Sequence, residues 1–158
     1  MKIQHTIEIA APSSRVWEVT VDVEAFPDHT PTMTAVERLD PGPIGVGTRI
    51  LIKQPMQRAK IWTVRTLEPE RTFAWTTTSL GTTVTATHDL VPTANGTMNT
   101  LTVEIEGPRA QVIGRIVRRP IRKALQEENK GLKSAAEPTP TPPHDSTDKG
   151  EAVCQRCG

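Results

Sequence analysis

His88 is the residue of this 158-residue sequence that is best placed to do chemistry. It alternates with Val84, Ala86 and Leu90, and the two-residue period of a strand turns all four side chains toward one buried side. An imidazole among apolar side chains can donate a hydrogen bond to a ligand carbonyl, or act as a general acid or base near neutral pH. The structural alternative, and the more frequent one, is a core histidine satisfied by a backbone group or a threonine. We therefore name His88 as the candidate catalytic residue and as a ligand contact.

A second histidine is expected on the same inner face. His5 alternates with Ile3, Ile7 and Ile9, the pattern of a strand with one buried side. If the two rings reach one internal space, they can act on the same ligand.

Aromatic and flexible apolar residues add candidate ligand contacts. Trp62 and Trp75 fall in neighbouring strand-like segments, where they could form a wall for a flat or lipid-like ligand or simply belong to the core. Phe26 and Met33 lie in short turns, where they can gate the mouth of a cavity or cover the core.

No further enzyme motif is present in the sequence. It lacks a glycine-rich phosphate loop, a nucleophile elbow and a paired-carboxylate signature, and without tyrosine it has no phenolic donor. Cys154 and Cys157 form half of a zinc ribbon, with only His144 nearby, whereas tetrahedral zinc needs four ligands. We expect a reducible thiol pair there and no metal or cofactor, with a zinc site shared between two chains as the remote alternative.

Composition excludes several classes of protein. No apolar run approaches the ~18 residues of a membrane-spanning helix, and the N-terminus leads into a strand rather than a signal peptide, which predicts a cytoplasmic protein. Residues 1–136 carry 17 basic and 14 acidic side chains, a net charge of only +3. The basic residues of 107–135 are not interleaved with aromatic ones, so they favour a solvated helix face, and we expect no nucleic-acid partner. The oligomeric state cannot be inferred.

Most of the chain consists of short strands. After the first strand, Ala11–Ser14 starts a helix and Asp22 can cap a second short one that Pro27 ends. Six strand-like segments follow, separated by turns rich in proline and glycine, and such short spacers require antiparallel neighbours. They are residues 32–39, 48–54, 59–67, 71–79, 82–91 and 97–106.

The segment from Gly107 to about Ala135 is predicted to be the single long helix. Pro108 is a helix-start signal, and apolar and basic residues then fall on two different faces. Pro120 predicts a kink and not a stop, because the periodicity resumes after it. The apolar face is expected to close a cavity against the sheet, with ligand contacts from Ile113, Ile116 and Val117.

The composition changes abruptly after Ala136. Residues 137–158 are rich in proline and threonine and cannot bury enough apolar surface to offset the entropy of ordering. We therefore predict one domain over 1–136 and a disordered tail over 137–158 that ends in the Cys-x-x-Cys pair.

This order of elements resembles the helix-grip fold of the START/polyketide-cyclase-like (SRPBCC) superfamily, polyketide cyclase/dehydrase type. The similarity includes the strand-to-helix segment 7–17, the loop 45–48, the strand and hairpin segments 86–90 and 96–97, and the closing helix 125–137. His29-Thr30-Pro31 departs from it, because many relatives carry Trp-x-Pro there. The resemblance implies an α+β fold, with a seven-stranded curved antiparallel sheet around a long C-terminal helix and two short helices between strands 1 and 2.

The resemblance also implies a deep cavity, but no single catalytic signature, so function must be argued from the site. The first hypothesis is binding or transport of a small hydrophobic molecule, lipid- or polyketide-like. The alternatives are an aromatase/cyclase-type enzyme that uses His88 as general acid/base, and a non-catalytic interaction protein. The enzyme question stays open, with binding favoured.

Overall fold

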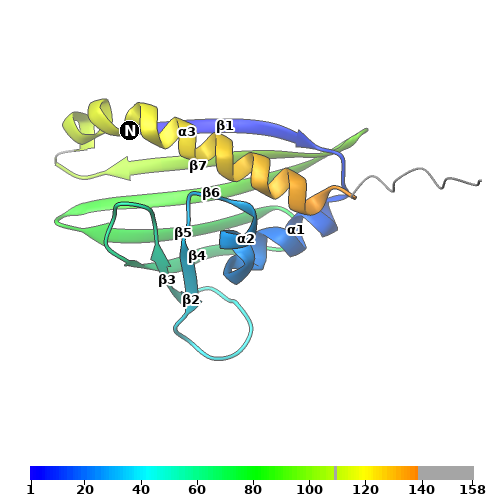
Figure 1. The fold of residues 1–158 in the computed structure, drawn as a ribbon, viewed down its shortest axis with the longest axis horizontal. Coiled ribbons are helices and arrows are strands. Elements are labelled where there is room, and N and C mark those ends of the chain that lie inside the picture. The colour runs from blue at the N-terminus through cyan, green and yellow to red at the C-terminus, as the bar shows by residue number, and fades with distance from the viewer. Residues whose placement is uncertain (109, 139–158) are drawn as a thin grey trace, which may run out of the picture.

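The structure is a computed structural model that describes residues 1–108 and 110–138 (Figure 1). The chain begins with β1 (Lys2–Ile9), α1 (Ser13–Val21), the 3₁₀ turn η1 (Val23–Ala25) and α2 (Phe26–His29). Six strands follow: β2 (Ala35–Arg38), β3 (Arg49–Lys53), β4 (Lys60–Glu68), β5 (Thr72–Ser79), β6 (Thr82–Thr93) and β7 (Gly96–Glu106). The last element is the long helix α3 (Ala110–Ala136). This order confirms the predicted α+β helix-grip fold.

The described strands form one seven-stranded antiparallel sheet in the order β1-β7-β6-β5-β4-β3-β2. Strands β2 to β7 are a meander, in which each pairs with the next along the chain. The β5–β6 turn is tight because Leu80 and Gly81 both adopt positive φ, as the type I′ form of a two-residue hairpin requires. β1 pairs with β7 along its whole length, from Lys2 opposite Glu104 to Ile9 opposite Thr97. This pairing brings the N-terminal strand beside the last one, next to α3.

Helix α3 lies across one face of the sheet, over β1 and β7, with α1 and α2 beside its C-terminal half (Figure 1). Its packed stripe runs through Ile121, Leu125, Asn129, Leu132 and Ala136 in steps of three and four residues. The last four of these are fully buried, so the C-terminal half is the part that holds the helix on the sheet.

The prediction that Ile116 packs toward the sheet is wrong, because its side chain is 76% exposed. Ile116 precedes Leu125 by nine residues, and at 100° per residue this puts it about 180° from the buried stripe. Val117, one residue further along, is half-buried. The helix continues through Pro120, as expected of a residue that was predicted not to end it.

The predicted tail lies mostly beyond the residues that the structure describes. The tail lies outside them from residue 139 on, with Cys154 and Cys157, so its disorder stays a prediction. Glu137, predicted as its first residue, accepts a hydrogen bond from the Ala10 backbone N–H at 2.7 Å.

Across the described chain, none of the helices has the length and apolar content needed to cross a bilayer.

Gly131 lets α3 approach α2 closely. A Cβ at this position would lie 2.0 Å from the His29 carbonyl oxygen, which belongs to the backbone and cannot rotate away. Helix propensity alone would make Gly131→Ala stabilising by about 1 kcal/mol. Because of the clash we expect the opposite sign, a loss of about 1–3 kcal/mol in the free energy of unfolding measured in urea.

Gly45→Ala is the matched control for this substitution. Gly45 has no positive φ, and no atom lies within 4 Å of the place where its Cβ would be, so its replacement should change the free energy of unfolding by less than about 0.5 kcal/mol. Equal stability of the Gly131→Ala and Gly45→Ala variants would contradict the close approach of α3 to α2.

His29, at the end of α2, predicts a pH dependence of stability. Burial lowers the pKa of His29 below its usual value of 6.5, although the nearby carboxylates of Asp28 and Glu128 oppose this. As the pH falls below about 6.5, the unfolded chain takes up a proton at His29 before the folded chain does, so stability decreases. In His29→Asn, the free energy of unfolding should therefore fall less between pH 7 and 5 than in the unmodified protein. An identical decrease in both proteins would rule out this contribution.

Candidate functional site

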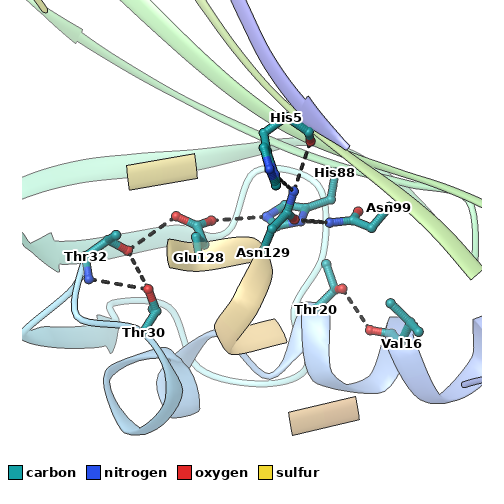
Figure 2. Close-up of polar contacts among 9 residues, drawn as sticks. All are labelled: His5, Val16, Thr20, Thr30, Thr32, His88, Asn99, Glu128 and Asn129. Carbon is teal, nitrogen blue, oxygen red and sulfur yellow. Dashed lines mark hydrogen bonds and ion pairs between the residues drawn. The ribbon is translucent and has the colours of Figure 1, made fainter. Parts of the chain in front are cut away.

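Asn129 of α3 is the centre of a buried polar network between helix and sheet (Figure 2). Its Nδ2 donates to the His5 carbonyl oxygen at 2.9 Å and lies 2.8 Å from His5 Nδ1. Its Oδ1 accepts a hydrogen bond from Asn99 Nδ2 of β7 at 2.6 Å. Asn99 and Asn129 are both fully buried, so one helix side chain links β1 to β7 through the interior.

His88 is the next member of the network. The pairing of β6 with β7 puts His88 opposite Leu101 and Leu90 opposite Asn99, which brings the His88 ring beside Asn99 on the inner face. His88 Nδ1 lies 3.5 Å from Asn99 Nδ2, and only 1% of the side chain is exposed.

Glu128 approaches the other side of the His88 ring (Figure 2). Its Oε1 lies 3.3 Å from His88 Nε2, close enough for an ion pair but without the alignment of a hydrogen bond. Its Oε2 accepts from the Thr32 hydroxyl at 3.4 Å, and Thr32 and Thr30 share a hydrogen bond of 2.9 Å between their hydroxyls. The carboxylate thus joins α3 to the segment that follows α2.

Aromatic rings surround the buried imidazole. The rings of Phe26 and Phe73 lie 6.4 and 6.3 Å from the His88 ring, centre to centre. Trp75 contacts both phenylalanines and also Trp62, at a ring separation of 5.8 Å. A polar group in this environment has little water to bind, so it depends on neighbouring side chains for its hydrogen bonds.

Three buried side-chain atoms of the described residues have no hydrogen-bond partner. Trp62 Nε1 is a donor, Asn99 Oδ1 is an acceptor, and His88 Nε2 is either, depending on where the ring carries its proton. Leaving such a group unpaired costs about 1–3 kcal/mol. Because most buried polar groups are paired, each of these three atoms is a candidate for a hydrogen bond to an additional molecule.

The structure brings most of the predicted site residues together. Trp62, Trp75, Phe26 and Met33 belong to one buried apolar cluster beside His88. His5 is half-buried and joins His88 through the two asparagines. The remaining three lie on the N-terminal half of α3: Ile116 is exposed, Val117 is half-buried, and the side chain of Ile113 lies outside the described ones.

Sequence reasoning missed Asn99, Asn129 and Glu128. Asn129 stands in the buried stripe of α3, three residues before Leu132 and four after Leu125, where an apolar residue is the usual choice. Asn99 shares the strand parity of Leu101. Polar side chains at these two apolar positions were the available signal.

Two pockets lined by described residues lie away from this network. Two open pockets, of about 500 and 440 Å³, occupy the end of the sheet where Pro12 and Ser13 meet Glu70 and Pro92. Neither lies between the sheet and α3, where a cavity was expected. Phe26 and Phe73 pack against the His88 ring, so a ligand that reaches the imidazole from that side must displace or separate them.

Comparison with protein families and solved structures agrees with the fold described above. The family model described as "Polyketide cyclase / dehydrase and lipid transport" matches residues 1–137. No protein with a curated description matches the sequence. Among solved structures, TTHA0849 from Thermus thermophilus is similar with a TM-score of 0.71 at 17% identity, covering 86% of this chain and 97% of that one.

Two further solved structures are informative. A START superfamily protein from Mycobacterium smegmatis gives a TM-score of 0.68 at 17% identity, covering 85% of this chain and 96% of that one. The di-domain ARO/CYC StfQ from the steffimycin biosynthetic pathway gives 0.64 at 14% identity, covering 85% and 50%. At these sequence identities the solved structures establish the fold alone, and membership of the family rests on the family model. The chain belongs to the polyketide cyclase/dehydrase and lipid transport family of the START/polyketide-cyclase-like (SRPBCC) superfamily.

Proposed function

We propose that this protein binds or carries a small hydrophobic molecule, lipid- or polyketide-like, between the sheet and α3. The observation that carries the proposal is that three polar atoms in a largely apolar interior have no hydrogen-bond partner, on Trp62, His88 and Asn99. A mostly apolar site with a few polar groups is the usual composition of a small-molecule site. The family description, which includes lipid transport, supports the same class of ligand.

The energetics favour a ligand that is largely apolar. Burying its hydrocarbon surface contributes about 25 cal/mol per Å². One polar group on it can pair with a buried atom that otherwise costs about 1–3 kcal/mol. The unpartnered atoms would therefore orient the ligand, and apolar burial would supply the affinity.

The route into the interior is proposed near α2. Phe26 of α2 and Met33, just before β2, are buried in the aromatic cluster, yet both belong to short segments at its edge. Thr30 and Thr32, in the same region, are hydrogen-bonded to α3 through Glu128, and Gly131 of α3 packs against the His29 backbone beside them. Displacement of this segment would expose the cluster without breaking the sheet.

A volume-filling substitution tests ligand binding. Ala86 lies on the inner face, opposite Trp75 on β5 and Val103 on β7, and is buried in the aromatic cluster. Because a ligand must separate these packed side chains, the larger side chain of Ala86→Leu should obstruct its entry and reduce the affinity of the folded variant for the neutral fluorescent probe N-phenyl-1-naphthylamine at least about tenfold. Titration of the probe, followed by its fluorescence, measures the affinity and the stoichiometry.

Ala94→Leu is the matched control, because Ala94 is exposed in the β6–β7 turn and its replacement should leave probe affinity unchanged. Native mass spectrometry of protein purified without detergent should also retain a small molecule. No saturable probe binding and no retained molecule would contradict the proposal and favour the third hypothesis, a non-catalytic interaction protein.

The His88–Glu128 pair favours an aromatase/cyclase-type enzyme as the second candidate. A carboxylate 3.3 Å from an imidazole nitrogen can stabilise the ring while it transfers a proton. If the protein is such an enzyme, His88→Ala should lower kcat on a bound polyketone by about 10²–10⁴-fold. Unchanged turnover of a polyketone substrate by His88→Ala would exclude this role, whereas a loss of probe binding alone would support the carrier.

A further inference from the structure

The donors and acceptors of the buried network can be assigned in order, starting from a backbone carbonyl. The His5 carbonyl oxygen can only accept a hydrogen bond, so the Asn129 side-chain atom 2.9 Å away must be the amide nitrogen. The same nitrogen lies 2.8 Å from His5 Nδ1 and donates its second hydrogen there. The orientation of the Asn129 amide is therefore determined by β1, and its Oδ1 must face Asn99.

The same reasoning carries the direction across to β6. Asn129 Oδ1 can only accept, so the Asn99 atom at 2.6 Å must be the amide nitrogen. The second hydrogen of Asn99 Nδ2 points toward His88 Nδ1 at 3.5 Å. A proton on His88 Nδ1 would place two donors face to face in the buried interior, which forfeits a hydrogen bond.

We propose that Asn129 and Asn99 are positioning residues that hold His88 as the neutral tautomer with its proton on Nε2. The ring then presents an N–H on the side of Glu128, and its unpartnered atom is a hydrogen-bond donor. This inference rests on the proposed function and makes it more specific. In the bound state, His88 donates a hydrogen bond to an acceptor atom of the ligand and does not accept one from it.

The tautomer can be read directly in the unliganded protein. In the full-length chain labelled with ¹⁵N-histidine, long-range ¹H–¹⁵N correlation spectra at neutral pH distinguish the Nε2–H, Nδ1–H and doubly protonated rings. We expect His5 and His88 both as Nε2–H, with His88 in this form in about tenfold excess or more, because the other tautomer loses a buried hydrogen bond. An Nδ1–H ring, a doubly protonated ring or an even mixture at His88 overturns the proposal.

Substitution of Asn99 separates positioning from packing. In an Asn99→Asp variant the new carboxylate has nearly the shape of the amide but offers only acceptors, which is unfavourable against Asn129 Oδ1. Where the variant folds, His88 Nδ1 should carry a proton, as the Nδ1–H ring or the doubly protonated ring. Asn95→Asp, the same change in the exposed β6–β7 turn, should leave the His88 pattern as it is. If Asn99→Asp does not fold, Asn129→Leu is the second variant: it frees the Asn99 amide to rotate and should give a mixture of both tautomers.

An unchanged Nε2–H pattern at His88 in a folded variant of either kind overturns the positioning role. These spectra need no ligand. The tautomer proposal can therefore fail while N-phenyl-1-naphthylamine still binds, and probe binding can fail while the tautomer stands.

Discussion

The hydrogen bonds that Asn129 makes to β1 and β7 are the interaction on which the rest of this structure depends. Apolar contacts hold a helix against a sheet but are not directional, so they do not determine the rotation of the helix. A buried amide does, because it loses free energy unless both its ends are paired. Here the pairing reaches a backbone carbonyl of the first strand and an asparagine of the last. The same hydrogen bonds therefore hold the helix over the sheet and orient the polar groups of the interior.

The rotation of α3 explains which of its residues meet the interior. With Asn129 facing the sheet, Leu125, Leu132 and Ala136 follow on the same stripe, and Glu128 is placed against His88 and Thr32. The same rotation turns Ile116 to solvent, about half a turn away. The rotation of α3 thus explains both why Ile116, which was predicted to line the interior, is exposed and why Glu128, which was not predicted, lies beside His88.

The interior combines two properties that stability alone would not favour. The interior is buried from solvent, and yet it contains polar atoms of Trp62, His88 and Asn99 without partners. Replacing such groups with apolar ones of similar shape is often neutral or stabilising. Their presence is thus easier to understand as the requirement of a site than as a requirement of the fold, which is why the proposed function is based on them.

The sequence by itself was sufficient for the order of elements and for the inner faces of the strands. Strict alternation placed His5, Trp62, Trp75 and His88, and the length of segment 107–135 identified the closing helix, because local periodicity and turn chemistry are properties of neighbouring residues. Only the tertiary structure decided which polar residues meet. Asn99, Glu128 and Asn129 are distant from His88 in sequence or on another element, and their contacts depend on strand register and helix rotation. Those are set by packing and by the pairing of buried amides, which no local pattern contains.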